Sequence, residues 1–163
     1  MKTKVYLAAI FAGALLFLAG HMTARSGATL TQKIHENLSF AMHGEAFAFA
    51  KYMLYARHAE QNGNAELARL FRRAAHVERF QHFAEEAELA GLVGSDADNL
   101  RDAIKGESYE VETMYRQFAE QAASAGDKAA AERFEEIRHD EAGHRDGFKA
   151  VLSNIEQRVP SGR

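Results

Sequence analysis

The chain of 163 residues contains no cysteine and a single proline, at position 160. The absence of cysteine excludes disulfide bonds, thiolate zinc sites, iron–sulfur clusters and thiol catalysis. No segment alternates polar and apolar residues as a half-buried strand does. The residues that are abundant are good helix formers, chiefly alanine, glutamate, leucine, arginine, lysine and glutamine. We therefore expect an all-α protein.

The charge is nearly balanced. The formal net charge is −3, and lysine and arginine are interleaved with acidic residues. A nucleic-acid-binding domain would instead carry a basic patch or stripe. We expect no nucleic-acid partner.

The N-terminal segment 1–28 differs from the rest of the chain. Lys2 and Lys4 precede an uncharged apolar run, Val5–Leu18, and the next charge is Arg25. This pattern predicts an apolar helix that serves as a secretory signal peptide or as a single membrane anchor. In both cases the two lysines stay in the cytoplasm. The rest of the chain is then anchored on the periplasmic, outer side of the inner membrane, or exported after signal cleavage.

Residues 29–157 are long enough for one domain with its own core, and we expect residues 158–163 to fray. Apolar residues three and four apart predict four helices. Their expected ranges are 29 or 31 to 62, 64–90, 99–125 and 127–155, with Thr31 as a candidate N-cap of the first helix. Gly63 and Gly126 mark tight turns, so the helices form two hairpins separated by the break Gly91–Asp98.

The two hairpins repeat one another. Glu45 corresponds to Glu107, and Glu78 corresponds to Glu141 with an offset that is longer by one position. The turn glycines Gly63 and Gly126 are already separated by the longer of these two spacings. We therefore place one extra residue in the second turn. Each repeat thus sets one glutamate midway along both of its helices.

These glutamates fall within the apolar stripes of their helices. Carboxylates do not gather in an apolar core without a cation, so the repeat predicts a metal site inside a four-helix bundle. Glu141 and His144 have the Glu-x-x-His spacing, which puts a carboxylate and an imidazole on one helix face. Such ligands suit iron or manganese. The candidate ligands are Glu45, Glu78, His82, Glu107, Glu110, Glu141 and His144.

The repeats differ beside the glutamates. Ala48 stands where the second repeat has Glu110, and Gln81 stands where it has His144. His82, four positions after the glutamate of the second helix, shares its helix face and is the expected substitute, with Gln81 as the alternative. Because the first hairpin has fewer ligands, we expect one metal to be held less tightly than the other.

Tyr52 and Tyr115 lie two turns beyond Glu45 and Glu107 on the same helix faces. We consider both as candidate catalytic residues that hydrogen-bond the metal cage or pass an electron. Packing in the core is the alternative interpretation.

The break between the hairpins constrains the assembly. If the second and third helices run parallel in one bundle, the link must return along a helix of about 40 Å. Eight extended residues reach only about 26–29 Å. Either the helices end early near the link, or two protomers exchange hairpins. We therefore expect a homodimer, with hairpin exchange as one form of it.

Four groups of residues together resemble a known family. They are Gly44-Glu45 with Tyr52; Ala68-Arg69-Leu70-Phe71 with Glu78; Gly106-Glu107-Ser108-Tyr109-Glu110-Val111-Glu112 with Met114-Tyr115; and Glu141-x-x-His144. They are similar to the ferritin-like domain of the rubrerythrin family, over residues 31–152. The resemblance implies a four-helix bundle that holds two irons. Carried over to this sequence, the ligands are Glu45, Glu78, Glu107, Glu110, Glu141 and His144.

Three features depart from the family pattern. Gln81 replaces the histidine expected three positions after Glu78, the rubredoxin domain is absent because there is no cysteine, and the N-terminal apolar segment is unusual. The resemblance is therefore to the peroxide-reducing domain without its own electron-delivering domain.

This resemblance implies a di-iron oxidoreductase of the peroxidase type, which reduces hydrogen peroxide in oxidative-stress defence. Its partners would be hydrogen peroxide or dioxygen, an external electron donor protein and, through the N-terminal segment, the membrane. Manganese, alone or with iron, is the alternative metal because it takes the same hard ligands. A membrane-associated iron-binding protein or ferroxidase, for iron handling or sensing, is the alternative function. A helical scaffold with a vestigial site is the third.

Overall fold

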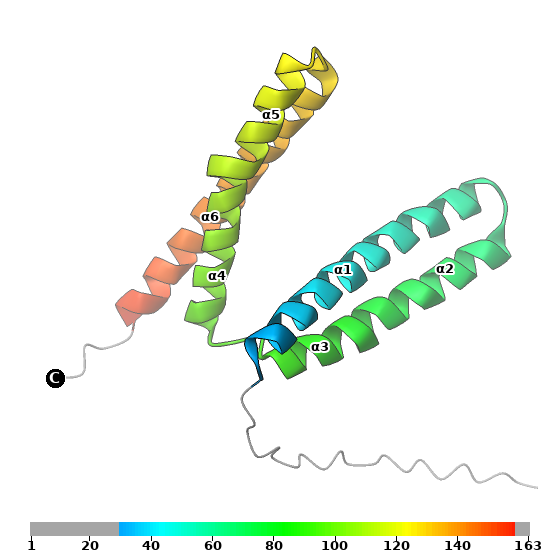
Figure 1. The fold of residues 1–163 in the computed structure, drawn as a ribbon, viewed down its shortest axis with the longest axis horizontal. Helices are drawn as coiled ribbons and strands as arrows, with labels where there is room; N and C mark the ends of the chain where they lie inside the picture. The colour runs from blue at the N-terminus through cyan, green and yellow to red at the C-terminus, as the bar shows by residue number, and fades with distance from the viewer. Residues whose placement is uncertain (1–29, 159–163) are drawn as a thin grey trace, which may run out of the picture.

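The computed structural model describes residues 30–158, and these residues form helices and short connections without a strand. The expectation of an all-α protein is confirmed. Figure 1 shows two antiparallel helical hairpins joined by a short link. The predicted N-terminal apolar helix, residues 1–28, lies outside the described residues, as does most of the predicted tail. Among the described helices, none is long and apolar enough to cross a membrane.

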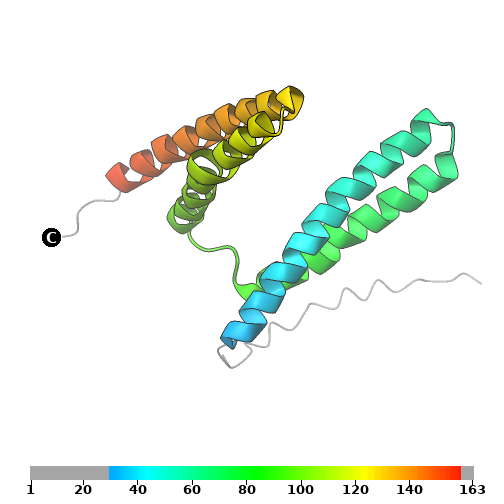
Figure 2. The ribbon, with the colours of Figure 1, turned by 45° about the horizontal axis from the view of Figure 1, so that its top comes forward.

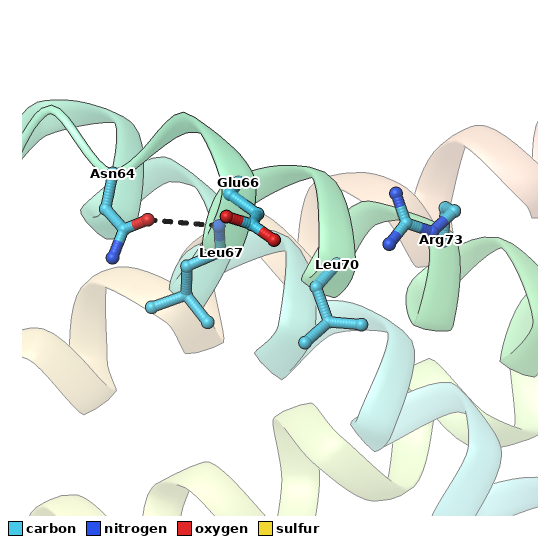
Figure 3. Close-up of a pocket in the computed structure, with 5 residues that line it drawn as sticks. All are labelled: Asn64, Glu66, Leu67, Leu70 and Arg73. Atoms are coloured by element: carbon cyan, nitrogen blue, oxygen red, sulfur yellow. Dashed lines mark hydrogen bonds between the residues drawn. The ribbon is translucent and has the colours of Figure 1, made fainter.

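The first hairpin consists of α1 (Gln32–Gln61) packed against three consecutive segments, α2 (Ala65–Val77), η1 (Glu78–His82) and α3 (Phe83–Ala90). Thr31 caps α1, as predicted, by accepting a hydrogen bond from the Ile34 N–H. Gly63 makes the turn with a φ of 72°, a conformation that favours glycine. Asn64 Oδ1 then accepts a hydrogen bond from the Leu67 N–H at 3.1 Å and starts α2 (Figure 3).

The second hairpin also pairs one long helix with an arm of three consecutive segments, but in the opposite order along the chain. Its broken arm comes first, as α4 (Asp96–Tyr109), η2 (Glu110–Met114) and α5 (Tyr115–Ser124), and its long arm is α6 (Lys128–Arg158). Gly126 makes the turn with a φ of 80°. Both turns therefore have the same left-handed glycine geometry.

The extra residue of the second repeat does not lie in the turn, so that prediction is wrong. Tyr52 and Tyr115, which precede the turns, already have the longer of the two offsets. Their environments match, since Tyr52 lies 6.0 Å from the Phe71 ring and Tyr115 lies 6.3 Å from the Phe134 ring. The offset therefore changes between Glu107 and Tyr115, where the π-helical turn η2 accommodates one additional residue.

The link between the hairpins is shorter than predicted. α4 begins at Asp96, before the predicted start at Asn99. The cause is local, because the Ser95 hydroxyl accepts a hydrogen bond from the Asp98 N–H and caps the helix one turn early. Residues 91–95 alone join α3 to α4.

The two hairpins do not pack against each other within one chain. No described helix of the first hairpin contacts a described helix of the second, and Figures 1 and 2 show the hairpins diverging from the link. The four expected helices are present, and in the described residues one chain does not close them into a single bundle, which was one of the two arrangements that the link left open. The residues that the structure describes accordingly form a thin core. Its buried apolar members are Leu38, Met42, Ala56, Ala59, Ala68, Ala75, Ala87, Val111 and Ala119, mostly alanines where two helices approach closely.

Candidate metal centre

Three candidate ligands of the first hairpin come together, and we call them the first half-site. Glu45 lies on α1, and Glu78 and His82 lie at the two ends of η1. One ligand atom of each lies within 4.8 Å of the others. His82 Nδ1 is 2.9 Å from Glu78 Oε2 and 3.7 Å from Glu45 Oε2.

The second hairpin contains a matching group, the second half-site. Glu107 lies on α4, and Glu141 and His144 lie on α6. Their ligand atoms also fall within 4.8 Å of one another. His144 Nδ1 is 2.6 Å from Glu141 Oε2 and 3.9 Å from Glu107 Oε1. The two half-sites thus have nearly the same internal geometry.

The π-helical turn η1 explains why His82, and not Gln81, joins the first half-site. A π-helix has more than four residues per turn, so a residue four positions after Glu78 returns to its face. In α6, an ordinary α-helix, the same return takes three positions, from Glu141 to His144. Gln81 is exposed and belongs to no group of potential ligands in the described residues. The structure therefore favours His82 where the sequence left both residues open.

Glu110 lies beside the second half-site but outside its group of three. It is the first residue of η2 and is half-buried. Burial, followed by the charge of Glu141, raises the pKa of its carboxyl above the ordinary value. Ala48 occupies the corresponding place in the first hairpin, so this carboxylate has no counterpart there.

One carboxyl group in each half-site, Glu45 in the first and Glu107 in the second, has a pKa above the ordinary value. A hydrogen bond with Glu78, followed by burial, raises the pKa of Glu45. Burial, followed by a hydrogen bond with Glu141, raises the pKa of Glu107. Carboxylates forced together without a cation repel one another, and this repulsion favours the neutral form.

The two histidines have pKa values above the ordinary value. For His144 the main cause is its hydrogen bond to Glu141. For His82, burial acts to lower the pKa, but the hydrogen bond to Glu78 and the charges of both glutamates outweigh it. Each imidazole therefore faces negative charge that a metal ion would otherwise balance.

Two carboxylate oxygens in the described structure are buried without a hydrogen-bond partner, Glu107 Oε2 and Glu86 Oε2. An unpaired buried acceptor is costly, and a cation would satisfy it. The donor set of carboxylates with one imidazole per half-site also suits hard or borderline divalent metals. The residues present thus fit a pair of iron or manganese ions, one for each half-site.

Glu86 was not among the residues predicted from the sequence. It lies four positions after His82, one turn along the same side of the helix, and its charge contributes to the raised pKa of Glu45. The four-residue spacing from His82 to Glu86 could have identified Glu86 from the sequence. Comparison of the two repeats could not, because the second hairpin has Phe148 at the corresponding position. Glu86 adds a carboxylate to the hairpin that lacks a counterpart of Glu110.

The two candidate catalytic tyrosines occupy equivalent aromatic clusters on the turn side of the half-sites. Tyr52 packs near Tyr55 and Phe71, and Tyr115 packs near Phe118 and Phe134. Packing in the core, one of the two interpretations, is thus observed for both. Burial, followed by the charges of Glu110, Glu141 and Glu107, raises the pKa of the Tyr115 hydroxyl, so this ring also lies close to the second half-site.

Within one chain, six of the seven predicted ligands form two separate groups of three, and Glu110 lies outside them. This follows from the separation of the hairpins that carry them. The ligand faces, by which we mean the side of each hairpin that carries its half-site, stay open. His82 is 51% exposed and His144 is 59% exposed.

Comparisons with known proteins identify the family of this chain. The family model for rubrerythrin matches residues 36–152. The chain is 35% identical to a rubrerythrin from Porphyromonas gingivalis over 136 residues, covering 76% of this chain and 68% of the relative. It is 30% identical to a putative rubrerythrin from Methanocaldococcus jannaschii over 144 residues, covering 75% and 70%.

One similar solved structure is that of fully reduced, all-ferrous nigerythrin. It is 28% identical, with a TM-score of 0.40, and the match covers 84% of this chain and 73% of that chain. The family match and the relatives establish the classification that the sequence motifs suggested: this chain belongs to the rubrerythrin family.

Proposed function

We propose that this protein reduces hydrogen peroxide to water at a di-iron centre and takes its electrons from another protein. The observation that carries the proposal is the pair of matching half-sites, each with two half-buried glutamates and one histidine. Membership of the rubrerythrin family supports the choice of iron. Manganese is the alternative metal, because the same ligands accept it.

The residues of the two half-sites would divide the work. His82 and His144 would each supply one nitrogen ligand, and the four glutamates of the half-sites would hold the two metals close together. Glu110 and Glu86 would add carboxylate oxygens, one on each hairpin. Bound ferrous iron would supply Lewis acidity and one electron from each ion for cleavage of the O–O bond.

Reduction of one hydrogen peroxide to two waters also needs two protons. Glu45 and Glu107 must lose their own protons before they can bind a metal, so the two protons would come from solvent. The Tyr115 hydroxyl, close to the second half-site, is suited to donate a hydrogen bond to a ligand carboxylate.

The chain has no cysteine and therefore no iron–sulfur or rubredoxin-type centre of its own. Each turnover consumes two electrons, which must come from a separate one-electron carrier protein. The same feature favours a second candidate function, iron binding with ferroxidase activity, because that chemistry needs no electron donor.

Stopped-flow absorption of the anaerobic Fe(II)-loaded protein tests the proposal and separates the two candidates. Peroxide reduction predicts rapid oxidation by one equivalent of hydrogen peroxide, slower oxidation by dioxygen, and repeated turnover with an artificial reductant. Oxidation by dioxygen alone, with no response to peroxide, would contradict the proposal and favour the ferroxidase. No binding of iron or manganese would contradict both and leave a helical scaffold.

We also propose that residues 1–28 carry the protein to or across the inner membrane. The support is the sequence pattern of Lys2 and Lys4 before the apolar run Val5–Leu18. Cell fractionation with N-terminal sequencing of the recovered protein tests it. Recovery of an intact, unprocessed chain from the cytoplasm would contradict the proposal.

A further inference from the structure

We propose that the outer face of the first hairpin binds the surface of a membrane that contains anionic lipids. By outer face we mean the side of the hairpin that lies away from its half-site. It carries Phe40, Phe47 and Leu54 of α1, Arg69 and Arg73 of α2, and Phe80 of η1. This contact is made by the folded helices, so it goes beyond both the proposed reaction and the role proposed for residues 1–28.

A line of exposed apolar side chains runs along α1. Phe40, Phe47 and Leu54 follow one another at intervals of seven residues, or two helical turns, so they lie on one side of the helix over about 21 Å. Phe47 comes two residues after Glu45, a rotation of about 200°, so this side is roughly opposite the half-site. The three side chains are 85%, 67% and 61% exposed. A helix that covers the half-site would leave this line in contact with water.

The internal repeat shows that the helical hairpin does not require this apolar line. Both hairpins pack a long helix against a broken arm around a left-handed glycine turn. At the three corresponding positions, however, the second hairpin has Asp102, Tyr109 and Gln117. Because the shared fold does not explain the apolar residues of the first hairpin, and because grouped exposed apolar side chains indicate an interaction site, we assign them to binding.

The charge on the outer surface is reversed between the two hairpins. Three arginines of α2 correspond to three glutamates of α6, namely Arg69, Arg72 and Arg73 to Glu132, Glu135 and Glu136. Within the part of the chain that the structure describes, only Arg72 of these arginines forms an ion pair, with Glu60. Arg69 and Arg73 precede Glu78 by nine and five residues, which places both on the side of α2 away from it, and both are exposed. Their positive charge is therefore available to an anionic partner.

Acidic residues are nearly absent from the same surface. Between residues 37 and 84 they are Glu45 and Glu78, which belong to the half-site, and Glu60 and Glu66, which lie close to the turn at Gly63. The centre of the outer face thus carries basic residues without neighbouring carboxylates. An anionic surface would approach it without repulsion between like charges.

Two cations lie over aromatic rings beside the apolar line. Lys51 Nζ is 5.3 Å from the centre of the Phe47 ring, and the Arg79 guanidinium is 5.0 Å from the centre of the Phe80 ring. Phe80 is itself 55% exposed. Phenylalanine and leucine beside lysine and arginine are typical of helices that lie at a membrane surface, where the rings enter the apolar layer and the cations meet lipid phosphates.

Two observations favour a lipid surface over a second copy of this chain. The apolar line on α1 and the arginines on α2 belong to helices that pack side by side, so together they suit a broad, flat surface (Figure 1). A second copy would offer the glutamates of its second hairpin, but Glu135 and Glu136 already pair with Arg138 and Arg133 of their own helix. In addition, α1 begins soon after residues 1–28, which we propose to act at the membrane.

Spin labels in the full-length protein test the contact, and the absence of cysteine allows one label to be placed at a time. His43→Cys puts the label on the outer face between Phe40 and Phe47, and Lys105→Cys puts it at the corresponding position of the second hairpin. EPR measures how often each label collides with oxygen, which concentrates in lipid, and with a nickel chelate, which stays in water. The surfaces are vesicles of phosphatidylcholine with and without phosphatidylglycerol.

On vesicles with phosphatidylglycerol, the label at position 43 should collide more with oxygen and less with nickel. The label at position 105 should keep the collision rates that it has without vesicles. Shielding of the label at position 43 from both reagents would show a protein contact, and unchanged rates would show no contact. Either result would overturn the proposal.

Charge reversal tests the contribution of the arginines. Arg69→Glu with Arg73→Glu should lower the equilibrium constant for the lipid contact at least about tenfold, because each basic residue is attracted to the anionic surface. Lys128→Glu with Lys149→Glu makes the same change in net charge at exposed positions of the second hairpin and should leave the contact unchanged. Equal weakening by both double variants would show that net charge alone matters and would overturn the assignment of the outer face. Peroxide turnover is measured separately, and its absence would contradict only the proposed reaction.

Discussion

His82 lies four positions after Glu78 and contacts it nearly as closely as His144 contacts Glu141 from three positions away. The distances from Nδ1 to the carboxylate oxygen are 2.9 Å and 2.6 Å. The π-helical turn η1 absorbs the additional residue and restores the alignment of the imidazole. Equivalent ligand positions in the two hairpins are thus reached through different helix geometries.

This relationship predicts that Gln81 cannot replace His82 as a ligand. The double variant His82→Ala with Gln81→His should bind the metal of the first half-site about tenfold more weakly than wild type, because position 81 is exposed and lies off that half-site. Isothermal titration with Fe(II) or Mn(II) measures the affinities. Full restoration of affinity by Gln81→His would show that η1 converts to an ordinary α-helix and that the assignment of His82 is wrong.

Glu107→Gln should stabilise the metal-free protein at neutral pH and weaken metal binding. The raised pKa of Glu107 means that folding favours the protonated carboxyl, so its stabilising contribution exists at low pH and is lost as pH rises through that pKa. A neutral glutamine removes the repulsion with Glu141 but also removes a ligand oxygen. Thermal unfolding and metal titration check the two effects.

Glu120→Gln is the control for that variant. Glu120 is exposed and forms an i,i+4 ion pair with Arg116 at 2.9 Å, which contributes about 0.3–0.5 kcal/mol. Its substitution should lower stability slightly and leave metal affinity unchanged. If Glu107→Gln destabilised the metal-free protein more than Glu120→Gln does, the carboxylates would not be the source of strain.

The metal-free and metal-loaded proteins should respond to pH in opposite directions. Folding raises the pKa of Glu45, Glu107 and Glu110 above 4.5 and that of His82 and His144 above 6.5. Groups with raised pKa values stabilise the fold below their unfolded pKa and lose that contribution as pH rises through the folded value. The metal-free protein should therefore lose stability between about pH 5 and pH 8.

Metal binding should strengthen over the same range. The ligands must lose protons before they can bind a metal, so affinity rises with pH. Urea unfolding with and without Mn(II) at several pH values measures both trends. A metal-free protein that becomes more stable toward pH 8 would contradict the assigned carboxylate cluster.

Tyr115→Phe should slow peroxide reduction more than Tyr52→Phe does, while both variants keep their metal content. The Tyr115 hydroxyl is the one whose pKa responds to Glu110, Glu141 and Glu107. Both rings occupy equivalent aromatic clusters, so loss of packing should be the same in the two variants. Stopped-flow rates of peroxide oxidation provide the comparison, and equal rates for both variants would assign the tyrosines to packing alone.

The sequence predicted the helices well, because they depend on local periodicity. Thr31 caps α1 and Gly63 ends its turn as expected, and the glutamates of both hairpins lie where the repeat placed them. The π-helical turns were missed because they leave no hydrophobic signature. In the sequence, η2 is visible as the longer spacing between the corresponding residues Tyr52 and Tyr115. From the sequence alone we attribute that extra residue to the turn.

The association of the hairpins could not be predicted from periodicity, because an apolar stripe does not identify the helix that covers it. The short link indicated the problem, and the cap at Ser95 made the link shorter still. Glu86 was not predicted because comparing the repeats identifies residues that both halves share, and this buried carboxylate is present in one half only.

The most direct test of the account is the magnetic state of iron in the intact wild-type protein. Mössbauer spectra of the Fe-57-loaded protein, before and after one equivalent of hydrogen peroxide per iron pair, report whether the irons are neighbours and whether peroxide oxidises them together. We predict about two irons per chain, ferrous before peroxide and converted to a coupled diferric pair after it. Isolated, uncoupled irons, or a ferrous signal that peroxide leaves unchanged, would contradict the joining of the two half-sites into one peroxide-reducing centre.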